Sequence, residues 1–280
     1  MQPIAQITIT LCNRLRNLSR KKFIFQKKNF LSIIFSRIIF TDFIFHYNFN
    51  MTQNKNENHT ALTHYTAAFI GGFLGLFPLV NAIHLFGSAQ TSNLIGTVTS
   101  IIDTDFQNLL FHFLGILLFS ISIFLATFLS KHSNINLKIL SMAVDSVAAF
   151  FMAYFPTEKN LPLIFYLYPT FFALSFHWCA FPGCYGFTCA TIFSTNNFRQ
   201  FISAITELFF NSDKSFSLKA KFFGLTLLFF HIGVFISYIL WKFLGNKGFL
   251  CAILPCFLLA LSETFILSKK NSCKKISKTI

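Results

Sequence analysis

The sequence contains very little charge and few acidic residues. Only 11% of its 280 residues are charged, and nine of them are Asp or Glu. Soluble globular domains carry about 25% charged residues. Because 54% of this chain is hydrophobic, the composition excludes an ordinary soluble protein. It predicts an all-α polytopic membrane protein with one membrane domain and no second globular domain.

Familiar catalytic and metal-binding motifs are also missing. The sequence has no Gly-x-Ser-x-Gly, His-Glu-x-x-His or Gly-x-x-x-x-Gly-Lys motif, which usually mark acyl transfer, zinc hydrolysis and nucleotide hydrolysis. Three of the cysteines recur every five residues, which is a poor zinc-binding pattern compared with a close Cys-x-x-Cys pair. The histidines share no spacing that is typical of metal ligands. These residues are Cys179, Cys184, Cys189, His84, His112, His177 and His231. We interpret them as packed core residues and predict no enzyme activity, cofactor or metal.

The net charge of +14 is not distributed as in a nucleic-acid-binding protein. Beyond the first 50 residues, Lys and Arg lie mostly in short loops and in the C-terminal tail, residues 269–280. Basic loops of this kind anchor membrane helices on the cytoplasmic side. We therefore expect the lipid bilayer as the partner, with no nucleic acid.

Residues 1–50 differ from the rest of the chain. They hold eight of the 23 Lys and Arg residues, and Arg37 and Asp42 interrupt their apolar part. Each charge in mid-span costs roughly 2.5–3.5 kcal/mol, which disfavours a stable span. We interpret residues 1–50 as sequence upstream of a start at Met51. The alternative is a basic amphipathic arm on the inner leaflet.

From Met51 onward, a polar tail (51–62) precedes a membrane domain (63–268) and the basic tail (269–280). The run from Gln107 to Ser130 has His112 as its one titratable residue. As a helix it would be about 36 Å long, enough to cross about 30 Å of hydrocarbon. The apolar segments are 64–86, 88–102, 107–130, 136–155, 161–181, 190–210, 219–244 and 248–268.

Two of these segments, 88–102 and 190–210, carry a polar motif with a shared Thr-x-Asn core. The motifs are Ala89-Gln90-Thr91-Ser92-Asn93 and Ser194-Thr195-Asn196-Asn197. An amide or hydroxyl without a partner in hydrocarbon costs several kcal/mol. The duplication therefore predicts two repeated halves, 63–155 and 161–268, each bringing a polar segment to a shared centre, as in many transporters.

Charge in the loops distinguishes two topologies. If the two polar segments are re-entrant or broken helices, six spans remain and both termini are cytoplasmic. Eleven of the 14 Lys and Arg beyond residue 60 are then inside, and Lys159, Lys242 and Lys247 are outside. Eight crossings would give nine inside and five outside. The positive-inside rule favours six spans, with the two halves inverted relative to each other.

The paired motifs suggest a polar binding site for a solute or ion. Thr and Asn offer donors and acceptors without charge. The candidate substrate-binding residues are Gln90, Thr91, Asn93, Thr195, Asn197 and Arg199. The alternative is that the motifs bond helices together, at about 0.6 kcal/mol per contact, and that Arg199 reaches to the inner membrane surface.

Carboxylates within apolar segments are the candidates for proton or ion coupling. These are Asp145 in segment 136–155 and Glu207 in segment 190–210. A charge in the membrane is costly and therefore indicates function by default. For Asp145 the alternatives are a structural hydrogen bond or a position nearer the membrane surface.

The order of several motifs resembles a known family. It comprises Gly71-Gly72-Phe73-Leu74 and the first polar motif, followed by Trp178, Phe181, Gly186, Thr191, Thr195-Asn196-Asn197-Phe198-Arg199 and Glu207. Over residues 64–268 this pattern resembles the YoaK-like bacterial membrane proteins, a family of unassigned function. The resemblance implies a multi-pass inner-membrane protein of a kind often interpreted as a transporter. Ser92 and Asn196 replace the family's glycines, and Gly75 stands where the family commonly has Asp.

The sequence thus favours a secondary transporter or permease for a small solute, driven by an ion or substrate gradient. A second hypothesis is a membrane protein that does not transport, either a partner of another protein or a family member that has lost activity. A third is an intramembrane enzyme.

Overall fold

The computed structural model describes residues 55–83, 85–156 and 162–276. The chain divides into two units, Met1–Asn56 and Glu57–Ile280. The helices described below belong to the second unit, apart from the first residues of the first helix. The interpretation of residues 1–50 as upstream sequence lies outside the described residues.

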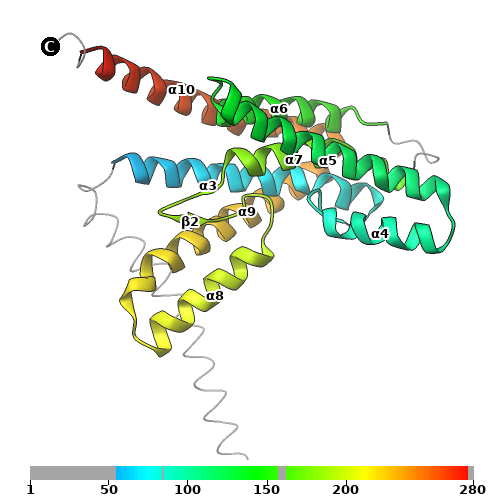
Figure 1. Cartoon of the computed structure of the whole chain (residues 1–280), viewed down its shortest axis with the longest axis horizontal. Coiled ribbons are helices and arrows are strands. Elements are labelled where there is room, and N and C mark those ends of the chain that lie inside the picture. The colour runs from blue at the N-terminus through cyan, green and yellow to red at the C-terminus, as the bar shows by residue number, and fades with distance from the viewer. Residues whose placement is uncertain (1–54, 84, 157–161, 277–280) are drawn as a thin grey trace, which may run out of the picture. The chain divides into compact units, whose positions relative to one another are not determined.

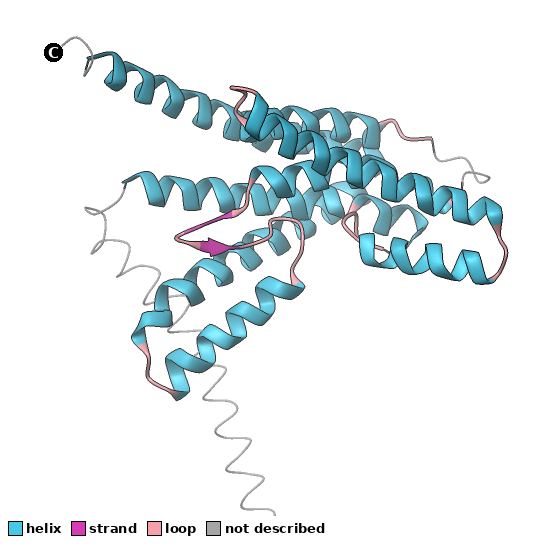
Figure 2. Cartoon of the chain, viewed as in Figure 1, coloured by secondary structure: helices cyan, strands magenta, loops and turns pink. Residues whose placement is uncertain are grey.

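The described residues are mostly helical, which confirms the predicted all-α class (Figures 1 and 2). In the first half, α3 is followed by a π-helical turn and then by α4, α5 and α6. Their bounds are Lys55–Gly75 for α3, Leu79–Ile83 for the turn, Gln90–Ile102 for α4, Phe106–His132 for α5 and Leu137–Ala153 for α6.

The second half, residues 161–268 in the predicted division, contains further helices and a strand pair. A 3-10 turn leads into α7, a short antiparallel strand pair follows, and α8, α9 and α10 come next, with 3-10 turns before and after α9. The bounds are Leu163–Leu167, Tyr168–Ala180 (α7), Gly183–Cys184 (β1), Phe187–Thr188 (β2), Thr195–Phe210 (α8), Lys214–Phe216, Ser217–Leu244 (α9), Gly245–Ala252 and Ile253–Ile276 (α10).

Three stretches among the described residues are long and apolar enough to cross a membrane. They are Glu57–Asn81, Phe106–His132 and Lys214–Ser268, the last of which contains α9 and most of α10. In the most apolar 18 residues of each stretch, 72% of the first stretch is buried and 22% of each of the other two, so α3 is the most enclosed of these helices. Large apolar side chains such as Phe113 and Phe124 on α5 point outward and are more than half exposed. Helices of this length with apolar outer faces indicate a membrane location.

The two polar motifs begin short helices, as their composition suggested. Helix α4 has 13 residues and α8 has 16, so they are about 20 and 24 Å long and fall short of about 30 Å of hydrocarbon. Each ends at a tight turn with one residue at positive φ, Thr104 after α4 and Ser212 after α8. These are the dimensions expected of the predicted broken or re-entrant segments.

Local capping fixes where two of the longer helices begin. Asp105 accepts a hydrogen bond from the Asn108 backbone amide at the start of α5, and Asn136 accepts from the Lys138 and Ile139 amides at the start of α6. The bonds from the backbone and side chain of Asn108 hold the pKa of Asp105 below its ordinary value. Asp105 therefore stays charged as a cap at neutral pH.

The long helix of each half packs against the first helix of the other half. In α9, Ser237 Oγ donates to the Phe73 carbonyl of α3 at 2.8 Å. In α5, Ser122 Oγ donates to the Phe172 carbonyl of α7 at 2.6 Å. Helices α3 and α9 approach closely at Gly233, which has no side chain. A Cβ at this position would collide with the Phe69 carbonyl.

The main core lies between α3, α6, α7, α10 and the 3-10 turn that precedes α10. It is rich in aromatic and unbranched apolar side chains. Its largest members include Phe73, Phe77, Met142, Met152, Leu174 and Phe249. The polar side chains described below are set within or beside this core.

Candidate functional site

The structure brings the two broken segments together. Ser88, directly before the first motif, donates its hydroxyl at 2.8 Å to the carbonyl of Ile192, which lies two residues before the second motif. These two residues are 104 positions apart, the same separation as the two Thr-x-Asn cores. Gly71 of α3 lies against the Thr191 carbonyl, where a side chain would collide. The breaks therefore meet beside α3.

Asn93 of the first motif is buried and its amide is bonded within the protein. Its Nδ2 donates to the His112 carbonyl at 3.1 Å, and its Oδ1 lies 2.8 Å from His112 Nδ1. Because His112 is on α5, Asn93 links the short helix to the long helix that follows it. Gly115 on α5 leaves room for the Asn93 amide.

Asn197 of the second motif is equally buried and is bonded to the loop before α8. Its Oδ1 accepts from the Ala190 amide at 3.3 Å. Its Nδ2 donates to the carbonyls of Ala190 at 2.6 Å and Phe193 at 3.0 Å. The side chain thus takes the place of a backbone partner and closes the loop.

The other candidate binding residues are dispersed. Thr91, Thr195 and Arg199 are exposed, and Gln90 is partly exposed. Arg199 contacts Asn196 at 3.4 Å, its neighbour on α8. Each motif is therefore divided into an exposed threonine and a buried asparagine, and the assignment of these residues to a substrate stays a prediction.

The two candidate carboxylates lie in very different surroundings. Glu207 is partly exposed near the end of α8, where it accepts a hydrogen bond from Asn211 at 2.6 Å. Asp145 on α6 is fully buried, and its Oδ2 lies 2.6 Å from Nδ1 of His177 on α7. Of the two, Asp145 is the carboxylate enclosed by the protein.

Sequence reasoning missed His177 and treated it as packed core. The two partners are 32 residues apart on different helices, so no spacing rule relates them. The sequence does indicate on energetic grounds that Asp145 has a polar partner. A carboxyl group in an apolar segment needs a polar partner, and the fully buried His177 supplies it.

Buried polar atoms without a partner gather around this pair. Among the described residues, seven buried side-chain nitrogen and oxygen atoms have no hydrogen-bond partner, and five of them belong to four residues. These are both ring nitrogens of His64, Ser141 Oγ, Asp145 Oδ1 and His177 Nε2. Each such atom costs about 1–3 kcal/mol if it stays unpaired. The cluster therefore has unused capacity for donating and accepting protons.

A second polar group lies towards the start of α6. Lys138 Nζ is 3.3 Å from Glu263 Oε1 of α10, and the same oxygen accepts from Thr63 Oγ1 of α3 at 2.9 Å. His59 of α3 contacts Ser262 of α10 at 2.9 Å. The Glu263 side chain is 8% exposed and that of Lys138 is 27% exposed, so the ion pair marks the edge of the buried polar region.

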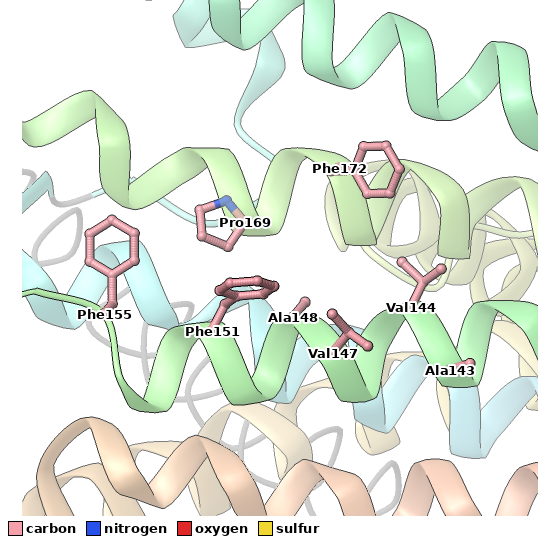
Figure 3. A pocket seen from close by; sticks show the side chains of 8 residues that line it. All are labelled: Ala143, Val144, Val147, Ala148, Phe151, Phe155, Pro169 and Phe172. Atoms are coloured by element: carbon pink, nitrogen blue, oxygen red, sulfur yellow. The ribbon is translucent and has the colours of Figure 1, made fainter.

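An apolar pocket lies along the face of α6 that does not carry Asp145. It has a volume of about 450 Å³ and lies between α6 and α7 (Figure 3). Val147 and Phe151, which line it, are more than half exposed, so it opens on the apolar outer surface. The lining residues are Ala143, Val144, Val147, Ala148, Phe151, Phe155, Pro169 and Phe172. Such a pocket suits an acyl chain better than a polar solute.

A polar pocket of about 830 Å³ lies at the far end of α6. Ala153 and Phe155, at and just after the end of α6, line one part of it. Lys242 and Lys247, two of the lysines predicted to be outside, line another part. Residues from the end of α6 and from the turn between α9 and α10 therefore share one end of the unit.

The described residues contain no group of three or more His, Cys, Asp or Glu side chains that could hold a metal ion. The buried pair instead offers proton chemistry. A carboxyl and an imidazole at 2.6 Å can share one proton, either as a neutral acid and base or as an ion pair. Both forms have the same net charge, so the proton can move between them without changing the net charge of the buried pair.

Comparison with known proteins gives a family but no characterised relative. No curated protein and no solved structure matches the chain. A family model described as "Protein of unknown function (DUF1275)" matches residues 63–262. This range covers most of the membrane domain, including both polar motifs, Asp145 and His177, and is consistent with the YoaK-like resemblance. The chain therefore belongs to the DUF1275 family of proteins of unknown function.

Proposed function

We propose that this protein is a proton-coupled secondary transporter for a small solute in the bacterial inner membrane, with Asp145 and His177 as its proton-handling pair. The observation that carries the proposal is the fully buried contact of 2.6 Å between these residues on α6 and α7. Ionisable groups in membrane cores are characteristic of proton relays in pumps and transporters.

Contacts at both ends of α6 support six crossings. Thr63 near the start of α3 and Lys138 at the start of α6 both bond to Glu263 of α10. With six spans, these three positions fall on the cytoplasmic side. With eight, the start of α6 would be on the opposite side from the start of α3. The pocket shared by the end of α6 and Lys242 supports the same choice, since six spans put both outside.

Matching contacts support two inverted halves. Each half has a helix, a break, a short helix, a long helix and a further helix. The bonds of Ser237 to Phe73 and of Ser122 to Phe172 are equivalent in this scheme, and the contact between Ser88 and Ile192 lies where the halves meet. Inverted repeats that meet at broken helices are a common transporter plan, in which one half moves against the other.

Within this scheme, Asn93 and Asn197 fix the shape of the breaks, while Thr91 and Thr195 remain available to a solute. The internal bonding of both asparagines also favours the second candidate function, a membrane protein in which the motifs serve packing alone. A measurement of solute uptake distinguishes a transporter from a protein in which the motifs serve packing alone.

The test uses purified full-length protein in sealed liposomes with an imposed pH gradient. Uptake is screened with radiolabelled amino acids, monosaccharides and carboxylic acids. A solute that enters with the gradient should lose its pH-driven uptake in Asp145→Asn and in His177→Gln. Asp103→Asn, an exposed carboxylate in the turn after α4, is the matched control and should behave as wild type. Gradient-driven uptake that survives in Asp145→Asn would contradict the proposal.

A further inference from the structure

The most unusual polar side chain outside the pair is His64 on α3. It is 2% exposed, and within the described part of the chain neither ring nitrogen has a hydrogen-bond partner. A neutral imidazole has one donor and one acceptor, and both are unused here. The large majority of buried side-chain polar atoms in folded proteins have at least one hydrogen-bond partner, so this side chain calls for an explanation.

His64 is connected to both polar groups. It follows Thr63, which bonds to Glu263, and it interacts electrostatically with both His177 and Lys138. Its ring also packs against Phe222 of α9, with 5.1 Å between ring centroids. The side chain is therefore buried against α9 and interacts electrostatically with one member of the ion pair and one member of the buried pair.

The polar side chains of α6 lie along one face of the helix. Lys138, Ser141 and Asp145 are spaced by three and four residues, so they lie on one side of the helix. Asp145 is about 10 Å deeper along the helix axis than Lys138. Ser141 Oγ and both nitrogens of His64 are the atoms without partners over this interval.

We propose that His64 relays protons between Glu263 at the edge of the buried region and the Asp145–His177 pair, so that α3, α6 and α10 form the proton access path from the cytoplasmic side. The cytoplasmic assignment rests on the proposed function and its six-span topology. The relay itself is argued from the burial of His64, its unpartnered nitrogens and its position next to Thr63, which bonds to Glu263.

Each step moves one proton and no electrons. Glu263, once protonated from the cytoplasm, gives its proton to one nitrogen of His64, and the other nitrogen releases a proton toward His177 Nε2. His177 then passes its Nδ1 proton to Asp145 Oδ2 across the 2.6 Å contact. The polar atoms along the interval are suited to holding water where two groups are too far apart for a direct hydrogen bond.

Other titratable groups face this path. His59 contacts Ser262 and Thr63 on the cytoplasmic side. Cys256 of α10 lies near Asp145 and interacts with it electrostatically. Lys138 stays paired with Glu263 until Glu263 is protonated, so the ion pair would act as the gate of the path.

The experiment follows the protonation of Asp145 directly and needs no solute. Full-length protein is reconstituted in sealed vesicles with one orientation, and time-resolved infrared spectroscopy follows the carboxyl band after a pH jump on one side. The band is assigned by its loss in Asp145→Asn. We expect the response to a cytoplasmic jump to slow at least tenfold in His64→Gln and in Glu263→Gln. It should be unchanged in His231→Gln, whose ring bonds to the Leu227 carbonyl within its own helix.

Unchanged rates in both His64→Gln and Glu263→Gln would overturn the relay, and a faster response to a jump on the outer side would overturn the cytoplasmic access. Both variants are first checked for wild-type thermal stability, and His64→Asn replaces His64→Gln if the latter is unstable. A response that depends on His64 in a protein without solute uptake would retain the relay and refute the transporter.

Discussion

The contact between Asp145 and His177 predicts strong energetic coupling. A buried hydrogen bond with a charged partner contributes about 1.5–3 kcal/mol. Either Asp145→Asn or His177→Gln removes this bond and leaves the other partner imperfectly satisfied. The double variant loses the same bond only once. We therefore expect the double variant to be more stable than the sum of the single effects by about 1.5–3 kcal/mol.

The assay is thermal unfolding of the purified protein in detergent, with all four members of the cycle measured at one scan rate because membrane proteins often unfold irreversibly. At about 2–4 °C per kcal/mol for a unit of this size, a loss of about 1.5–3 kcal/mol should lower the midpoint of each single variant by about 3–12 °C. Ser146→Ala on the same helix, which removes a bond to the Met142 carbonyl and touches neither partner of the pair, should change it little. Additive effects of the two single variants, with no coupling, would refute a shared proton between Asp145 and His177.

Two further predictions concern the packing that holds the site. Asn197→Ala removes three hydrogen bonds to the loop before α8 and should cost about 1–3 kcal/mol, seen as a lower unfolding midpoint and lower abundance, whereas the exposed Asn196→Ala should not. An unfolding midpoint for Asn197→Ala equal to that of Asn196→Ala would show that the Asn197 hydrogen bonds do not stabilise the loop before α8. Gly233→Val places a side chain against the Phe69 carbonyl of α3 and should cost about 1–3 kcal/mol or more, while Gly224→Ala meets only the movable ring of Phe201. Equal stability of these two glycine variants would contradict the close crossing of α3 and α9.

Much of the fold could be predicted because continuous apolar runs determine helices. The expected segments 107–130 and 136–155 correspond to α5 and α6 within a few residues. The expected segment 64–86 is not a single α-helix, since α3 ends at Gly75. Pro78 gives the signal for this break, because it lacks a backbone donor and its ring disfavours the preceding helical turn.

The site was harder to predict because it depends on how helices pack. The apolar setting of Asp145 identified a buried carboxylate, but its partner is decided by the crossing of α6 and α7, which no local pattern records. The motifs were predicted to be central, and Ser88 and Ile192 do meet. The bonds of Asn197 to Ala190, seven residues away, follow from the tendency of Asn to bond to nearby backbone, which could have been expected from sequence.

The central claim is that two halves of opposite orientation form six crossings and carry the Asp145–His177 pair in the membrane core. Single cysteines at residues 134, 159 and 246 of a cysteine-depleted protein, labelled from outside intact cells with a reagent that does not cross membranes, test it most directly. The account predicts labelling at 159 and 246 and none at 134. Labelling at 134 and 246, with none at 159, would mean eight crossings and would contradict it.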